Sequence, residues 1–306
     1  MPIRLGYACI NMHLSETQKL TSSRTMRKAT FLAKGLPAVS ELIVSNLTSL
    51  QTIMEWNVAN NFTLYRMSSD MFPWHSEYSF SDLPHYKQIR AMLERTGQYA
   101  IDNGIRLSFH PGQFVCLASK NPKVVENARK DIETHGLIMD YMLQPSDHNA
   151  KINIHIGGAY DDKPGTAKRF CKVIDTLSSS VYDRLTVEND DRLNLYTTQE
   201  LYDMVHMETG VPIVFDYHHH ACNPGHLTEP EALSLACSTW QNAKPCTHYS
   251  ESAQLERGPR APFRAHSKFI YSKINDHGFD IDCVVEAKGK EQAILKYFSD
   301  HGVSNA

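Results

Sequence analysis

Apolar runs of five to seven residues alternate with segments of helical periodicity along this chain. The runs are expected to be strands, and they span residues 3–9, 63–68, 105–110, 151–156, 184–188, 211–216, 244–248 and 281–286. Such alternation is typical of βα units around a parallel sheet, and eight of these units close into a barrel. The sequence therefore predicts an α/β fold, a single (β/α)8 TIM barrel.

Length and helical pattern both favour one domain. The chain has 306 residues, more than the ~250 typical of such a barrel, so one large domain over residues 1–306 fits better than two small ones. Apolar residues between 39 and 60 fall on one helical face, and the segment 87–103 repeats the pattern before Gly104 supplies a C-terminal stop.

Acidic and imidazole side chains stand at or next to the ends of six predicted strands. They are His110, His155, Glu188, Asp216, His248 and Glu286. The carboxyl ends of parallel strands meet on one rim, where such side chains can converge on metal ions. Strand alternation turns Lys151, Asn153 and His155 into the barrel. It does not decide which of the three histidines at 218–220 joins them, because a turn is expected there. Clustered charges are costly to bury without a cation, so the sequence predicts a metal site.

Composition narrows the class of protein. The formal net charge is −3, so any contact with nucleic acid must come from a local basic groove. The seven cysteines are odd in number and scattered, which indicates reduced thiols in a cytoplasmic protein. No apolar leader and no long uninterrupted apolar stretch is present, so neither secretion nor membrane spanning is expected.

Short motifs along nearly the whole chain then point to one family. They are Gly6-Tyr7 with Asn11, Tyr65-Arg66-Met67-Ser68-Ser69, His110-Pro111-Gly112-Gln113-Phe114, Asn153-Ile154-His155-Ile156-Gly157-Gly158-Ala159-Tyr160, Val187-Glu188-Asn189-Asp190, Phe215-Asp216 with His219-His220 and Asn223-Pro224, and Glu286-Ala287-Lys288. In combination and order they resemble the UV damage endonucleases, DNA-repair nucleases related in fold and metal chemistry to endonuclease IV. The resemblance implies a nuclease that nicks damaged double-stranded DNA immediately 5′ of pyrimidine dimers and 6-4 photoproducts, leaving 3′-hydroxyl and 5′-phosphate ends.

The resemblance also implies a ligand set for two or three divalent ions, with Mn²⁺ expected. The metal ligands would be His110, His155, Glu188, Asp216, His219, His248 and Glu286. His266 matches a further histidine of the same site, and Glu188 and Glu286 would share in catalysis. Phosphodiester hydrolysis needs one ion to activate water and another to neutralise the leaving oxygen. Lys288 is expected to contact a phosphate oxygen, the alternative being a solvated lysine on the rim.

Lesion recognition has its own candidates under this resemblance. Gln113 and Phe114 match a dipeptide that is wedged into the duplex at the lesion, where an aromatic ring replaces lost stacking. Tyr7 and Asn11 are expected to touch the extruded nucleotides or the backbone. Basic residues on two loops are candidates for phosphate contacts; they are Arg24, Arg27, Lys28, Arg257, Arg260 and Arg264.

Two positions depart from the family pattern. Glu77 stands where relatives place a metal-binding histidine, and His75 lies two residues earlier; either is a candidate to complete a third metal site. Cys246 stands where relatives carry a lysine, two residues before His248. Lys244 is one candidate substitute, and a thiolate ligand at Cys246 is another reading.

Three other functions remain open from the sequence. A sugar isomerase of the xylose-isomerase type shares the barrel and the metal rim, but needs no DNA contact. An apurinic-site endonuclease of the endonuclease IV type differs only in motif detail. A damage-binding barrel that has lost cleavage is the third. A monomer is expected, because a nuclease that grips a bent duplex needs its rim free.

Overall fold

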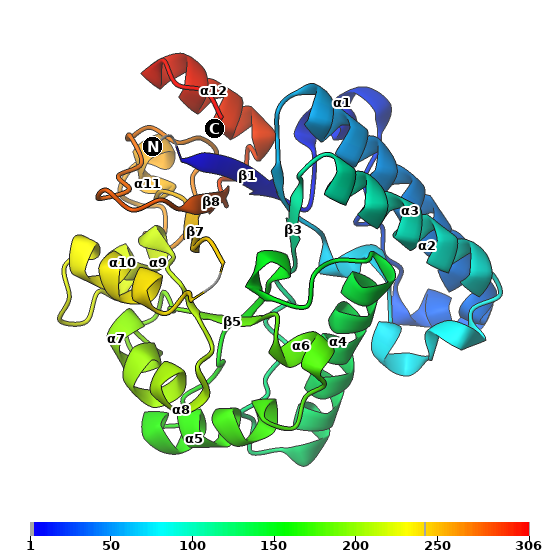
Figure 1. Cartoon of the computed structure of the whole chain (residues 1–306), viewed down its shortest axis with the longest axis horizontal. Helices are drawn as coiled ribbons and strands as arrows, with labels where there is room; N and C mark the ends of the chain where they lie inside the picture. Colours follow the sequence, from blue (N-terminus) through cyan, green and yellow to red (C-terminus); the bar gives the residue numbers. More distant parts are fainter. Residues whose placement is uncertain (1–2, 242, 306) are drawn as a thin grey trace.

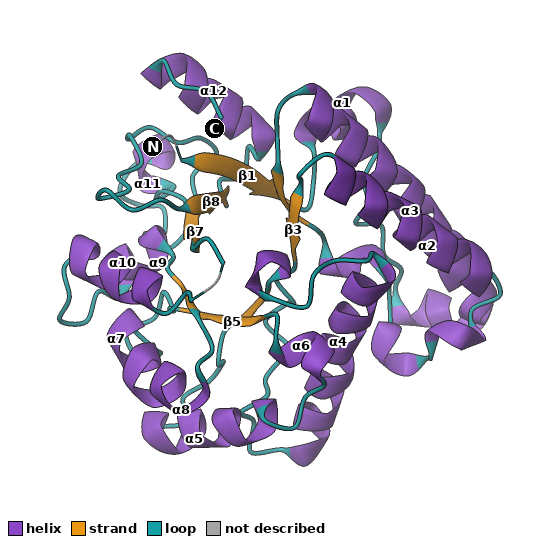
Figure 2. Cartoon of the chain, in the orientation of Figure 1, coloured by secondary structure: helices purple, strands orange, loops and turns teal. Residues whose placement is uncertain are grey.

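Eight short strands form an inner ring, and helices surround it (Figures 1 and 2). The computed structural model describes residues 3–241 and 243–305. Within them the strands are β1 (Arg4–Ala8), β2 (Leu64–Arg66), β3 (Arg106–Ser108), β4 (Ile152–Ile154), β5 (Leu185–Glu188), β6 (Ile213–Val214), β7 (Cys246–Tyr249) and β8 (Asp282–Val285). Each lies inside one of the eight predicted runs or reaches one residue past it.

The ring closes through parallel pairing. Five strands pair in the order β3-β2-β1-β8-β7, and three pair in the order β4-β5-β6. Parallel bridges between Phe109 and Ile152 and between Asp216 and His248 connect the two sheets. Each strand therefore neighbours the one before and after it in the chain, and the last neighbours the first. The predicted TIM barrel is confirmed.

The outer layer consists of helices and short helical turns. The helices are α1 (Met12–Gln18), α2 (Lys28–Ala59), α3 (Tyr86–Asp102), α4 (Pro122–Tyr141), α5 (Lys163–Ile174), α6 (Ser179–Tyr182), α7 (Thr198–Leu201), α8 (Met207–Thr209), α9 (Tyr217–Cys222), α10 (Glu229–Ser238), α11 (Gln254–Arg257) and α12 (Glu291–His301). The turns are η1 (Ser69–Met71), η2 (His75–Glu77), η3 (Phe80–Asp82) and η4 (His148–Ala150), and a π-helical segment, η5 (Tyr202–His206), joins α7 to α8. None of the described helices is long and apolar enough to cross a membrane.

Two predicted helices are confirmed with shifted ends. The segment 87–103 corresponds to α3, which is followed by Gly104 at φ +63°. Residues 39–59 of the predicted segment form the C-terminal two thirds of α2, which begins eleven residues earlier than predicted. This helix bends at Gly35, whose backbone is not helical, and Pro37 follows inside it. The apolar face predicted for 39–60 is buried against the barrel.

The barrel interior is layered, and the layers place the functional groups at one end. At the amino ends of the strands, Asp282 forms ion pairs with Arg4, Arg106 and Lys244. Above this floor lies a small apolar layer that includes Ala8, Leu64, Val214, Cys246 and Val284. The carboxyl ends of the strands then carry the polar rim.

Candidate metal centre

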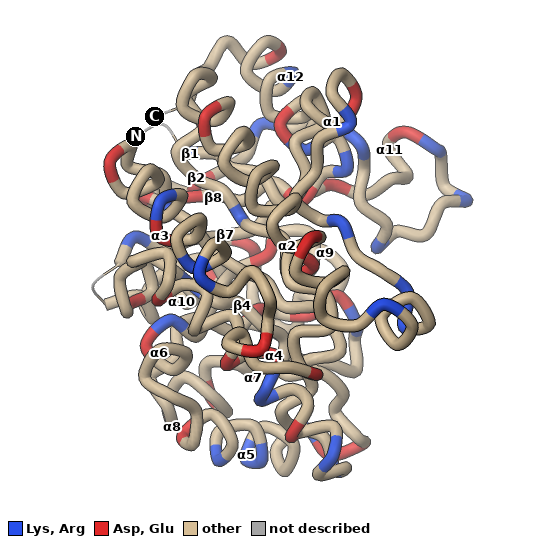
Figure 3. The backbone as a smooth tube through the Cα atoms, turned by 90° about the vertical axis from the view of Figure 1, so that its right-hand side faces the viewer, with Lys and Arg blue, Asp and Glu red and all other residues tan. Residues whose placement is uncertain are grey.

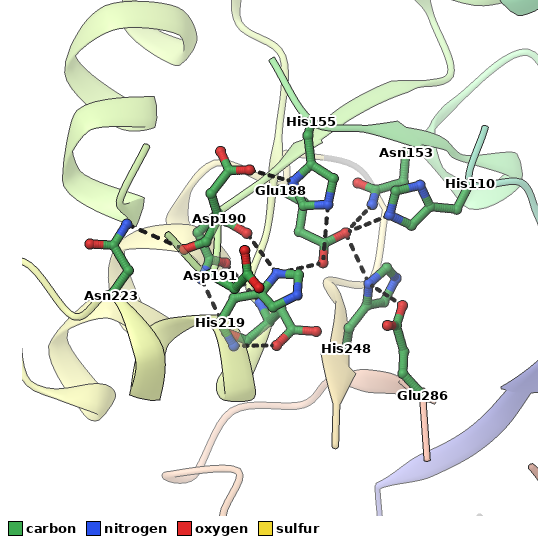
Figure 4. A network of polar contacts seen from close by, with 12 residues as sticks. His110, Asn153, His155, Glu188, Asp190, Asp191, His219, Asn223, His248 and Glu286 are labelled. Atoms are coloured by element: carbon green, nitrogen blue, oxygen red, sulfur yellow. Dashed lines mark hydrogen bonds and ion pairs between the residues drawn. The ribbon is translucent and has the colours of Figure 1, made fainter. Parts of the chain in front are cut away.

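Glu188, at the carboxyl end of β5, is the central side chain of the rim (Figure 4). It is fully buried, and four imidazoles approach its carboxylate. His110 Nε2 and His248 Nδ1 lie 3.1 and 3.0 Å from Oε2, and His219 Nδ1 lies 3.3 Å from Oε1. His155 Nε2 lies 4.0 Å from Oε1. The structure thus brings five of the predicted ligands together from five different segments of the barrel.

Glu286 joins this group from the end of β8. Its Oε1 lies 3.2 Å from His248 Nδ1, and it forms an ion pair with Arg66 at the end of β2. His266 Nδ1 lies 3.9 Å from Oε2 of the same carboxylate. Burial opposes ionisation, but Arg66 and His248 hold the pKa of Glu286 well below its usual range. Glu286 is therefore an anion at the edge of the rim, with His266 beside it.

A turn after β6 selects one of the three consecutive histidines. Asp216 caps the first turn of α9, and its Oδ1 accepts a hydrogen bond of 2.7 Å from the backbone N–H of His219. The helical turn directs the His219 ring to Glu188, whereas His218 packs against His266 at 5.4 Å between ring centroids. The expected turn is present. Burial raises the pKa of Asp216 to about 7.

The rim has the properties of a site for divalent cations. Two groups of candidate ligands share Glu188: one is His110, Glu188, His248 and Glu286, and the other is His155, Glu188 and His219. A shared carboxylate is suited to bridge two ions about 3.5–4 Å apart. Four buried atoms of the rim make ion-pair contacts at most and no well-directed hydrogen bond to a described residue; they are His155 Nδ1, Glu188 Oε1, Asp216 Oδ2 and His248 Nδ1. Orphaned polar atoms are costly, and a cation would satisfy them.

Without a cation, the same side chains should make folding depend on pH. The carboxylates of Glu188 and Asp190 outweigh the effect of burial and raise the pKa of His155 to about 9. An unfolded histidine titrates near ~6.5. The contribution of His155 to the free energy of unfolding is therefore complete below about pH 6.5. It is lost as the pH rises through about 9, because the folded chain then releases a proton that the unfolded chain no longer holds.

We expect the free energy of unfolding of the metal-free protein to fall between about pH 6.5 and 9. Urea denaturation in EDTA at both values measures this, and His155→Gln should flatten the dependence. Mn²⁺ competes with the protons, so Mn²⁺ affinity should rise over the same range. An unchanged pH slope in His155→Gln would contradict this assignment.

Lys151, immediately before β4, supports one imidazole from inside the barrel. Its side chain is fully buried, and its Nζ is hydrogen-bonded to His248 Nε2 at 3.1 Å. Burial lowers the pKa of Lys151. The contact fixes the orientation of the His248 ring, with Nδ1 toward Glu188 and Glu286. Hydrogen bonds of this kind orient metal-binding histidines.

This contact bears on the departure at Cys246, where relatives carry a lysine. Lys244, the substitute considered from the sequence, lies on the barrel floor at 2.6 Å from Asp280 and 3.3 Å from Asp282. Cys246 is buried in the apolar layer and belongs to none of the candidate ligand groups of the described residues. The lysine that reaches His248 is instead Lys151, immediately before β4.

Lys151→Met should weaken Mn²⁺ binding by roughly 10- to 100-fold, the range typical of losing a partner that orients a ligand. Methionine fills a similar volume but cannot hold the His248 ring through its Nε2. Titration of the metal-free variant with Mn²⁺, followed by electron paramagnetic resonance, measures the change. Lys244→Met is the matched control, and it should lose stability without losing Mn²⁺ affinity. Equal affinities in the two variants would exclude the role given to Lys151.

The structure does not bring every predicted residue to the rim. Glu77 is exposed on η2 and lines a cavity of about 560 Å³ against α4. His75 is held by Phe72 and Asp131, with Nδ1 2.8 Å from the Phe72 carbonyl oxygen and Nε2 3.1 Å from the Asp131 carboxylate. Neither belongs to the groups around Glu188. A third metal site at these positions stays a prediction.

Two candidates for contact with DNA lie in the protein interior. Tyr7 is on the outward face of β1, fully buried, and its hydroxyl donates to Asn57 Oδ1 at 2.5 Å. Asn11 Nδ2 donates to that hydroxyl at 2.9 Å, and its Oδ1 caps α1 by accepting from the backbone N–H of Leu14 at 2.9 Å. The structure therefore gives both side chains partners within the fold and leaves neither facing solvent.

The other lesion candidates are open to solvent beside the rim. Gln113 is exposed, and Phe114 is 83% exposed. Gln113 lines a cleft of about 670 Å³ that also includes His110, His155 and His219. An aromatic ring this exposed contributes little to the core. It is available to a ligand that covers the cleft.

Basic groups stand on the loop that carries α11. Figure 3 shows this loop projecting on the side opposite the two chain termini, with several of its positions basic. Arg264 is held at 3.1 Å from Asp191. Arg24, on the other loop, donates to backbone carbonyls of that loop, including Lys19 at 3.0 Å. Lys288 is exposed next to the rim.

Four residues that hold the candidate ligands in place were not predicted from the sequence. Asn153 donates to Glu188 Oε2, Asp190 Oδ1 lies 3.2 Å from His155 Nδ1, Arg66 pairs with Glu286, and Lys151 bonds to His248. Strand alternation had already turned Asn153 and Lys151 inward, as the structure confirms, but it could not name their partners. Arg66 and Asp190 lay within the quoted motifs without an assigned role.

Comparisons with known proteins identify the family of this chain. Residues 3–304 match the family model described as UV-endonuclease UvdE. A UV-damage endonuclease of Schizosaccharomyces pombe is 34% identical over 99% of this chain, which spans only 51% of that relative. A UV DNA damage endonuclease of Bacillus cereus (strain G9842) is 32% identical over 98% of this chain and 95% of its own length.

Solved structures are similar to this chain over nearly its whole length. SacUVDE superposes with a TM-score of 0.84 at 26% identity, over 98% of this chain and 99% of that chain. Endonuclease IV from Thermus thermophilus shares the fold, with a TM-score of 0.58 at 12% identity over 97% of this chain and 98% of its own. The resemblance noted in the motifs is confirmed, and the chain belongs to the UV-endonuclease UvdE family.

Proposed function

We propose that this chain is a metal-dependent endonuclease that nicks UV-damaged double-stranded DNA immediately 5′ of pyrimidine dimers and 6-4 photoproducts. The observation that carries the proposal is the convergence of four imidazoles on the buried carboxylate of Glu188. The UV-damage endonuclease names of the relatives supply the substrate class.

Two or three divalent ions, with Mn²⁺ expected, would supply an activated water and neutralise the charge on the leaving oxygen. Glu188 would bridge two of them, with the histidines and Glu286 as outer ligands. The protein fixes these ligands in advance: Asn153 holds Glu188, Lys151 holds His248, and Arg66 holds Glu286. Preorganised groups of this kind lower the barrier without rearrangement during the reaction.

The damaged strand would lie across the cleft beside His110 and His155. Phe114 and Gln113 would enter the duplex at the lesion and replace the stacking that the dimer has lost. A damaged base pair is cheaper to open than an intact one, so the wedge would favour lesions. A monomer would suffice, because the residues of this account all belong to one chain.

Cleavage of three labelled duplexes tests the proposal. One carries a single thymine dimer, one an abasic site and one no damage, each incubated with Mn²⁺ or with EDTA. We expect a Mn²⁺-dependent nick directly 5′ of the dimer that leaves a 3′-hydroxyl, with undamaged DNA intact. Cutting at the abasic site alone would indicate an apurinic-site nuclease. Binding without cutting would indicate an inactive damage binder.

A further inference from the structure

Lys290 adopts a backbone conformation that is unfavourable for any side chain. It precedes α12 with φ 53° and ψ −129°, in a region that glycine enters freely and other residues avoid. Among non-glycine residues such strain persists where the surrounding structure imposes it, and it gathers at functional sites. A lysine at this position therefore calls for a reason that resides in its side chain.

Hydrogen bonds on both sides hold the strained residue in place. The backbone N–H groups of Lys288 and Gly289 donate to Ser267 and Lys268 carbonyls at 2.9 and 2.8 Å. A Cβ at Gly289 would meet the Lys268 carbonyl oxygen at 2.6 Å, so the chain passes there without freedom to shift. The Lys290 carbonyl in turn accepts from the Ala293 N–H at 3.0 Å in the first turn of α12. The conformation is thus fixed by the fold.

Lys290 lies in the loop that follows β8 at the carboxyl end of the barrel, four residues after Glu286, and this loop is hydrogen-bonded to the segment directly after His266. The side chain of Lys290 is half-buried, whereas Lys288 is exposed. Burial lowers the pKa of Lys290, and the charges of Arg66 and Glu286 shift it in opposite directions. Its charge also lowers the pKa of His266. Among the described residues its Nζ has no hydrogen bond or ion pair, and the carboxylate of Glu286 pairs with Arg66 instead.

From this geometry we propose that Lys290 is the residue that contacts a phosphate oxygen of the DNA backbone beside the metal centre, in place of Lys288. The inference rests on the proposed function, and it specifies how the rim holds the strand to be cut. A half-buried amine on a fixed backbone presents a charge in one place, which a flexible exposed lysine does not. Phosphate contacts from lysine position a nucleic acid and make binding depend on salt.

Because the backbone of Lys290 is strained, one substitution should raise the stability of the protein and lower its activity on DNA. Lys290→Gly should raise the melting temperature, by roughly 2–5 °C, because glycine accepts the backbone without strain. The same variant should nick the dimer duplex roughly tenfold more slowly under single turnover, with the slope of log affinity against log salt reduced by about 1. Lys290→Met should show the same losses with DNA and no gain in melting temperature.

Lys296→Met removes a lysine of α12 that pairs with Asp300 and is the matched control, so its DNA affinity and nicking should remain within about twofold of the parent protein. Lys288→Met should lose less than Lys290→Met. Lys290→Arg keeps the charge and should restore most of the affinity. If Lys290→Met nicks as fast as the parent, or if Lys288→Met shows the larger loss, the proposal is overturned while the proposed function stands. A parent protein that fails to nick the dimer duplex at all would overturn both.

Discussion

Glu188→Gln should reduce nicking of UV-damaged DNA by at least about 1000-fold. A metal site supplies several kcal/mol of transition-state stabilisation, and each 1.36 kcal/mol is a factor of about ten. Glutamine keeps the size of the side chain but loses the charge that holds the four imidazoles, two of them at 3.0 and 3.1 Å. It also cannot bridge two cations. Single-turnover nicking of a dimer duplex in saturating Mn²⁺ measures the loss.

Mn²⁺ content separates this effect from misfolding. The variant should bind fewer ions per chain than the parent while keeping its circular dichroism spectrum. Glu291→Gln is the matched control, because Glu291 is also fully buried but accepts its hydrogen bond from the backbone of His13 at 2.7 Å and belongs to neither candidate ligand group around Glu188. It should retain Mn²⁺ and nicking. A Glu188→Gln protein that nicks within tenfold of the parent would remove Glu188 from the centre of the site.

Phe114→Ala should reduce nicking at a dimer by roughly 5- to 150-fold. Stacking of an aromatic side chain on a base is worth about 1–3 kcal/mol, which converts to that range. The ring is 83% exposed, so its removal should change the free energy of unfolding by no more than about 0.5 kcal/mol. The loss should appear in binding of the damaged duplex, while affinity for undamaged DNA changes little.

Two further variants sharpen that test. Phe114→Trp keeps an aromatic face and should retain most of the activity. Met207→Ala removes a side chain that is 66% exposed on α8, where the chain approaches the amino end of β6, and it should have no effect. If Phe114→Ala discriminates damaged from undamaged DNA as well as the parent does, lesion recognition resides elsewhere on the rim.

The sequence predicted what strand alternation controls. Inward and outward positions differ by one residue along a strand, so His110, Glu188 and Glu286 could be placed on the rim from their positions in the sequence alone. The same rule turned Lys151 inward. Its partner could not be predicted, because the contact with His248 depends on how β4 and β7 face each other across the barrel.

Positions outside the strands were harder to predict. His75 and Glu77 lie on a short turn, and the direction of each side chain depends on packing against α4, which is distant in sequence. Tyr7 shares the outward face of β1 with Leu5, so alternation alone could have placed it away from the rim. The strain at Lys290 leaves no signal in composition or periodicity, because it arises from hydrogen bonds to residues about twenty positions away.

The most direct test of the account is a titration of metal-free protein with Mn²⁺ in which bound metal and nicking of a dimer duplex are measured in the same sample. We expect no nicking in EDTA, nicking that rises as ions fill the rim, and no such rise in Glu188→Gln. Metal-free protein that nicks the dimer duplex at the full rate, or nicking that does not follow metal binding, would contradict the assignment of the Glu188 rim as a metal-dependent nuclease centre.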